Sequence, residues 1–222
     1  FVHKDFEACD DGNMVDNDTC YMCKPAKCGD FVLHPGEKCD DGNELPDDGC
    51  EPDCTPSVRL VFVTSMPFQG DLGGLGGADK KCEDLAAMAG LPPTSYRAWL
   101  SDANQWPAKF MKPYDFPYVK VNGVKVADSW MGLVSGNLLS PIDVTEKGGA
   151  PPALGQAPCP GYSVHTNTTA QGTQASAEHC SNWMITEGTT TGGSSAKKDG
   201  QWTQVCNPAS CDFPAPIYCV QQ

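Results

Sequence analysis

The amino-acid sequence predicts an α+β fold for its larger part, preceded by small, disulfide-rich repeats that are dominated by loops. The repeats are visible as an internal sequence similarity between residues 7–20 and residues 37–50, thirty positions later. The matched positions hold cysteine, carboxylate, amide or glycine residues and no core-forming aliphatic residue. From residue 58 the pattern changes to strand-like runs and one amphipathic helix. About 165 residues remain there, enough for one domain with a sizeable core.

The repeats divide the first part of the chain into a partial unit, residues 1–27, and a complete unit, residues 28–57. The complete unit contains Cys28, Cys39, Cys50 and Cys54, whose spacing is C-x10-C-x10-C-x3-C. Because the repeat has no hydrophobic core, disulfides are its natural means of stabilisation.

The partial unit contains Cys9, Cys20 and Cys23, and a shift of thirty residues would place its first cysteine before Phe1. We therefore expect that the chain begins inside a repeat. One of the three cysteines is then unpaired or bonded outside the unit.

The matched carboxylates and amides of the repeats supply clustered oxygen donors. They are Asp10, Asp11, Asn13, Asp18, Asp40, Asp41, Asn43 and Asp48. Calcium takes six to eight oxygen ligands, and the glycine of each Asp-Asp-Gly-Asn run permits a turn that lets several converge. The pattern is not an EF-hand. We expect structural calcium in the repeats; the alternative is that these side chains only accept hydrogen bonds within turns.

In the larger domain, residues 58–222, local patterns predict the elements in order. Residues 58–63 form a strand-like run. Residues 78–91 predict a helix, since Cys82, Leu85, Ala86 and Ala89 follow helical spacing and Gly90 suits the C-terminal cap.

Further along, residues 96–100 predict a strand, and Asn122-Gly123 predicts a hairpin between residues 118–121 and 124–127. Residues 135–200 are rich in Gly, Pro, Ser and Thr, which predicts long loops. A last strand is expected over residues 216–220.

Composition limits the location and the partners of the chain. Thirteen cysteines without CxxC…CxxC spacing indicate disulfides in an oxidising compartment, and no apolar run approaches the ~20 residues that span a bilayer. The sequence shows no signal peptide, so we expect the numbering to begin after export. Residues 1–57 hold 15 of 28 acids and 4 of 15 bases, a net charge of −11 within a total of −13. This charge disfavours nucleic acid and anionic lipid, and we expect a secreted or surface-attached, extracellular protein.

Both parts resemble known families. The pattern C-G-D-x(6)-G-E-x-C-D-D-G-N-x(4)-D-G-C-x(3)-C resembles cysteine-rich repeats of secreted myxobacterial and protist proteins, a domain of unknown function. The larger domain resembles the C-type lectin-like fold, and more closely its endostatin-like variant in bacterial extracellular proteins, including leptospiral surface adhesins. The segments that carry this second resemblance are residues 62–65, 70–79 with Cys82, 98–101, 180–183, 202–203 and 217–219.

The endostatin-like resemblance implies three disulfides. The cysteine of the helix pairs with that of the terminal strand, giving Cys82–Cys219, and the inner pair is Cys180–Cys211. Cys159 and Cys206 remain as the third pair, which fastens the long loop.

The resemblance also bears on ligand binding. Sugar-binding C-type lectins hold calcium with a proline-containing triplet and a Trp-Asn-Asp triplet. Here Thr203 and Gln204 stand in place of Asn and Asp, and residues 180–200 lack the proline triplet. Because a neutral pair lacks the charge that calcium needs, we do not expect calcium-dependent sugar binding.

Catalysis is not expected either, because neither HExxH nor Gly-x-Ser-x-Gly occurs. Trp106 lies in a loop and is a candidate anchor for a sugar face or a protein, with core packing as the alternative. The sequence thus predicts a non-catalytic binding or adhesion module for a glycan or an extracellular matrix protein. The alternative is a structural subunit of an extracellular assembly that self-associates.

Overall fold

The computed structural model describes residues 9, 20–21, 24–155 and 158–222. The chain divides into two compact units, the first ending at Val58 and the second running from Arg59 to Gln222. This division lies one residue beyond the predicted boundary. No helix in the described residues is both long and apolar enough to cross a membrane.

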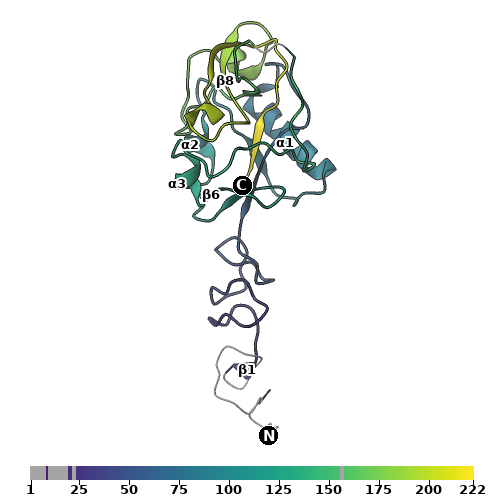
Figure 1. Ribbon diagram of the computed structural model, residues 1–222, viewed down its shortest axis with the longest axis vertical. Helices are drawn as coiled ribbons and strands as arrows, with labels where there is room; N and C mark the ends of the chain where they lie inside the picture. The colour runs from purple at the N-terminus through teal and green to yellow at the C-terminus, as the bar shows by residue number, and fades with distance from the viewer. Residues whose placement is uncertain (1–8, 10–19, 22–23, 156–157) are drawn as a thin grey trace. The chain divides into compact units, whose positions relative to one another are not determined.

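The described residues of the first unit are almost entirely loop (Figure 1). The regular structure among them comprises a short antiparallel pair, β1 (Cys20–Tyr21) and β2 (Lys24–Pro25), and an isolated bridge between Cys50 and Pro56. Three disulfides cross-link it: Cys9–Cys20, Cys28–Cys54 and Cys39–Cys50. Of the three cysteines whose pairing the sequence left open, two are thus joined, and Cys23 lies outside the described residues.

The second unit is built on a five-stranded sheet with the order β4-β10-β3-β5-β6. Its strands are β3 (Arg59–Val63), β4 (Tyr96–Ala98), β5 (Tyr118–Lys120), β6 (Lys125–Ala127) and β10 (Tyr218–Gln221). The terminal strand β10 lies between β3 and β4 and is antiparallel to both, whereas β3 and β5 are parallel. The last residues of the domain therefore complete the centre of the sheet.

Helix α1 (Gly74–Met88) packs against β4 (Figure 1). It begins four residues before the predicted start, because the glycine run contributes its first turn. Gly77 is needed there, since a Cβ at this position would lie 2.2 Å from the carbonyl oxygen of Leu72. The predicted C-terminal cap is confirmed: Gly90 has a φ of +72°, and its N–H donates to the carbonyl of Ala87.

The core lies on both faces of the sheet. Alternation along β3 directs Val61 and Val63 to one face, where they pack with Trp99, Trp202 and Tyr218. On the other face Phe62 meets the apolar side of α1. The remaining helices are single turns, α2 (Pro107–Phe110), α3 (Trp130–Leu133), α4 (Cys180–Trp183) and the 3-10 turn η1 (Gly200–Trp202).

The segment predicted as long loops contains more structure than expected, and this part of the prediction is corrected. Strands β7 (Val164–His165), β8 (Thr189–Gly193) and β9 (Cys206–Ser210) form a second, antiparallel sheet. Strand β8 has the sequence Thr-Thr-Thr-Gly-Gly, whose glycines argue against a strand. Both glycines are required by close packing: a Cβ would lie 1.8 Å from the Tyr162 ring at Gly192, and 2.2 Å from the Trp202 carbonyl oxygen at Gly193.

Three disulfides fix the second unit, and they are the pairs that the endostatin-like resemblance implies. Cys82–Cys219 joins α1 to β10, Cys180–Cys211 joins α4 to the residue after β9, and Cys159–Cys206 fastens the loop before β7 to β9. The first of these closes a sequence separation of 137 residues. In the chain-entropy picture such a loop stabilises the fold by about 4–5 kcal/mol.

His165 is fully buried where the two sheets meet. Its Nε2 lies 3.1 Å from the carbonyl oxygens of Phe68 and Phe213, and its Nδ1 lies 2.6 Å from the Tyr162 hydroxyl. Because carbonyls only accept, Nε2 carries the proton and Nδ1 accepts from the tyrosine. Burial outweighs the two carbonyl contacts and lowers the pKa of His165 from 6.5 to about 4.

This depressed pKa predicts a loss of stability in mild acid. Below pH 6.5 the unfolded chain protonates His165 and the folded chain does not, so the unfolding free energy falls as the pH drops toward about 4, by roughly 3 kcal/mol at the end of the window. Denaturant unfolding at a series of pH values measures it. His165→Gln should lose the slope within this window while keeping any carboxylate-driven slope at lower pH. Equal slopes in both proteins would contradict the assignment.

Candidate functional site

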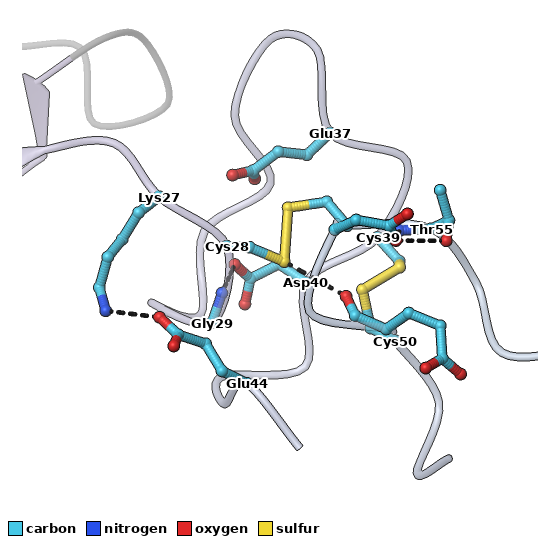
Figure 2. The surroundings of a disulfide bond; sticks show 12 residues. Lys27, Cys28, Gly29, Glu37, Cys39, Asp40, Glu44, Cys50 and Thr55 are labelled. Carbon is cyan, nitrogen blue, oxygen red and sulfur yellow. Dashed lines mark hydrogen bonds and ion pairs between the residues drawn. A yellow bond between two sulfur atoms is a disulfide. The ribbon is translucent and has the colours of Figure 1, made fainter. Parts of the chain in front are cut away.

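The complete repeat is organised around the carboxylate of Asp40, which lies beside its two disulfides (Figure 2). One oxygen accepts the N–H groups of Gly29 at 2.8 Å and Asp30 at 3.2 Å, and the other accepts those of Phe31 and Gly42, both at 2.8 Å. Burial alone would raise the pKa of Asp40, but these four hydrogen bonds outweigh it and hold the pKa below its ordinary value. Asp40 is therefore an anion whose hydrogen bonds hold residues 29–31 and residue 42 of the loop close together.

The other predicted ligands of this repeat also accept hydrogen bonds within turns. Asp41 accepts the backbone N–H of Asn43 at 3.3 Å and that of Cys50 at 3.1 Å. The Asn43 amide accepts from the N–H of Leu45 at 2.6 Å and donates to Asp48 at 3.1 Å. This arrangement supports the alternative that the sequence left open, in which these side chains form turns.

The remaining predicted ligands, Asp10, Asp11, Asn13 and Asp18, lie outside the described residues. Within the described part of the chain, no group of three or more His, Cys, Asp or Glu side chains is arranged to hold a metal ion. Calcium ligation by the repeats stays a prediction.

The second unit carries a strained turn at residues 180–183. All four residues have a left-handed backbone, with φ of 51° at Cys180, 51° at Ser181, 60° at Asn182 and 62° at Trp183. Left-handed backbone costs roughly 1–2 kcal/mol for each residue other than glycine. A run of four is therefore maintained by its surroundings, and the Cys180–Cys211 disulfide is one of them.

The loop of residues 101–106 lies against this turn and fixes it. The indole N–H of Trp183, which is fully buried, donates to the carbonyl of Ser101 at 2.9 Å, and the Asn182 amide accepts the N–H of Ala103 at 3.1 Å. The side chain of His179 accepts the N–H of Asn182 at 2.8 Å. We call residues 101–106 and 179–185 together the loop pair.

The loop pair presents apolar side chains next to polar ones. Met184 and Ile185 follow the turn and are 58% and 40% exposed. Ile185 lines a surface pocket of about 280 Å³, whose lining also includes Glu178, His179 and Glu187. The combination of a flexible thioether with carboxylates and an imidazole suits recognition of a partner surface more than it suits a buried core.

Trp106, the predicted anchor, is half-buried at the start of α2. The ammonium of Lys109 lies 4.8 Å from the centre of its ring and donates to the carbonyl of Asn104 at 2.7 Å. Trp106 is thus neither fully packed in the core nor fully exposed, and it is the last residue of the first loop of the loop pair.

Comparisons with known families agree with this architecture. A model of the family described as Collagenase NC10 and Endostatin matches residues 58–222. The chain belongs to this family. Residues 26–55 match a second family, a domain of unknown function named DUF4215, and none of the curated proteins compared with the chain matches it.

The endostatin domain, together with the six disulfides of the described residues, indicates an extracellular binding module.

In the endostatin domain, the residue that the sequence analysis compares with a calcium ligand of sugar-binding lectins lies in the interior. Thr203 is fully buried; its hydroxyl accepts the indole N–H of Trp99 and donates to the carbonyl of Thr168, both at 2.9 Å. A residue with these contacts has no surface on which to bind an ion or a sugar. That calcium-dependent sugar binding is not used stays a prediction.

Asn167 is the centre of the same buried polar network. Its amide donates to the carbonyls of Ser101 and Ser176, and its oxygen accepts the N–H and the hydroxyl of Ser176. All four hydrogen-bonding positions of the side chain are used. Asn167 thus connects the loop pair to the second sheet, a role that no local sequence signal announces.

Replacing Asp40 should loosen the complete repeat. Asp40→Asn keeps the shape but puts an amide group where an N–H must be accepted, so the opening free energy of the loop should fall by about 1–2 kcal/mol. Hydrogen exchange of the N–H groups of residues 29–31 and 42 measures this. Glu44→Gln, which breaks only the exposed Lys27–Glu44 ion pair, is the control and should leave exchange unchanged. Equal exchange in both variants would show that Asp40 does not organise the loop.

Proposed function

We propose that the endostatin domain is a non-catalytic binding module that recognises a glycan or an extracellular matrix protein through the loop pair. The observation that carries this proposal is the left-handed turn at residues 180–183, which places exposed Met184 and Ile185 at the surface. Backbone strain persists only where the surroundings over-determine it, and it gathers at functional sites.

Rigid presentation supports binding over chemistry. The turn is held by a disulfide and by Trp183, and the facing loop is held by Asn167, so little conformational entropy is lost when a partner binds. The histidines here are occupied within the fold: His165 is buried, and His179 accepts from Asn182. An enzyme that used this surface would need a nucleophile with an adjacent general base, and neither histidine is positioned as such a base.

Self-association in an extracellular assembly is the alternative. It is favoured by further exposed apolar side chains on the endostatin domain, Met66, Met88 and Met131. A sedimentation coefficient that rises with protein concentration, without binding to glycans or matrix proteins, would support this alternative.

Calcium in the repeats is a structural part of the proposal. Asp40 already accepts four N–H groups, which leaves its oxygens no free lone pair, so we assign it an organising role. Asp41 and Asp48 accept fewer hydrogen bonds and, with Asn43, are the ligands that we propose. Their oxygen atoms would have to converge when calcium binds, because the described residues contain no preformed cluster of metal-binding side chains.

Thermal unfolding in calcium and in EGTA, with disulfides intact, tests the calcium proposal. A ligand that binds only the folded state at a hundredfold excess over Kd adds about 2.7 kcal/mol. We expect the Asp41→Asn/Asp48→Asn variant to lose this shift, and Asp40→Asn to unfold more easily with and without calcium. If calcium does not change the unfolding temperature at any concentration, the calcium proposal is wrong and Asp41 and Asp48 serve only to form turns.

Binding measurements test the role of the loop pair. The intact chain is screened against a glycan array and immobilised matrix proteins, and Met184→Ser/Ile185→Ser should weaken any hit at least about tenfold, since burying two apolar side chains contributes more than 1.4 kcal/mol. Met88→Ser is the control, because Met88 is 75% exposed at the end of α1. Equal losses in both variants would place the binding surface elsewhere.

A further inference from the structure

The complete repeat displays an aromatic side chain under backbone strain. Phe31 is 80% exposed, and its φ of +72° lies in the left-handed region, where a phenylalanine is rare. The N–H of Phe31 is fixed by Asp40 at 2.8 Å. Burial of the ring does not offset the strain, because most of the ring remains in solvent.

The loop is shaped to carry this ring. Gly42 faces it so closely that a Cβ at position 42 would lie 1.9 Å from a carbon of the Phe31 ring. The N–H of Gly42 binds the same oxygen of Asp40 that holds Phe31. One carboxylate thus positions both the aromatic residue and the glycine on which it rests.

The complete repeat that carries Phe31 is strongly anionic. Residues 28–57 contain nine Asp or Glu and a single Lys, a net charge of −8 with His34 neutral. The face of an aromatic ring attracts cations, and carboxylates around it add to that attraction and steer a positively charged partner toward it. Anionic partners, including sulfated glycans and nucleic acids, are repelled.

The aromatic position recurs in the sequence. Phe31-Val32 stands thirty residues after Phe1-Val2, the same interval that relates the two Cys-Asp-Asp-Gly-Asn runs. The framework of the repeat consists of cysteines, acids and glycines, and it does not need an exposed phenylalanine at this place. Recurrence in the same register suits a contact residue that each repeat supplies.

We propose that the acidic repeat is a second binding surface, with Phe31 as its anchor, and that it binds an arginine- or lysine-rich segment of a partner protein. A guanidinium or ammonium group would lie over the ring while neighbouring carboxylates pair with further cations. This surface is distinct from the loop pair and does not depend on what the endostatin domain binds.

A fluorescein-labelled octa-arginine peptide, titrated with the full chain and followed by fluorescence anisotropy, tests the proposal. At physiological ionic strength, Phe31→Ala should weaken binding about tenfold, whereas Phe31→Tyr should keep it. Met131→Ala is the control, because Met131 is 73% exposed but lies on the endostatin domain, and it should bind like the unaltered chain. Equal affinity of Phe31→Ala and the unaltered chain, or no binding by the unaltered chain, would overturn the proposal.

Phe31→Gly separates a contact role from a structural one. Glycine accepts a φ of +72° without strain, so this variant should unfold at the same temperature as the unaltered chain or higher, and yet bind as weakly as Phe31→Ala. A lower unfolding temperature would show that Phe31 serves the fold. The proposal of a cationic partner would also be wrong if the chain bound an uncharged glycan in a Phe31-dependent way and did not bind the peptide.

Discussion

Backbone N–H and C=O groups must find partners wherever a chain leaves helices and sheets, and most of the residues that the structure describes lie outside them. In the complete repeat one carboxylate, Asp40, satisfies four N–H groups. In the endostatin domain the side chains of Asn167 and Thr203 do the converse and donate to the backbone carbonyls of Ser101 and Thr168. Both devices replace a regular ladder of hydrogen bonds with side-chain partners, and the surfaces described above depend on them.

Disulfides complement these side-chain hydrogen bonds. Cross-links limit the unfolded ensemble, and hydrogen bonds select one loop conformation within it. The left-handed turn needs both, since Cys180 is bonded to Cys211 while Trp183 is held by the carbonyl of Ser101.

How much of this could be read from the sequence depends on the range over which each signal acts. The strand near residues 59–63, the helix cap at Gly90 and the Asn122-Gly123 hairpin are local patterns, and all are present in the structure. Strand β8 was missed because its glycines are required by close packing against residues distant in sequence, the Tyr162 ring and the Trp202 carbonyl. The left-handed turn was missed for a similar reason: Cys-Ser-Asn-Trp carries no glycine to announce it, and its causes lie in residues about 30 and 80 positions away.

The polar interior also bears on how such a domain acquires a ligand. Thr203 hydrogen-bonds inward to Trp99 and Thr168, so this part of the loops is fixed by the protein's own side chains. A loop whose backbone does not depend on an ion can change its exposed side chains without losing its shape. Met184 and Ile185 occupy such positions, since they contact solvent while the residues before them hold the backbone. Specificity in this architecture therefore rests on a few surface side chains carried by an internally satisfied framework.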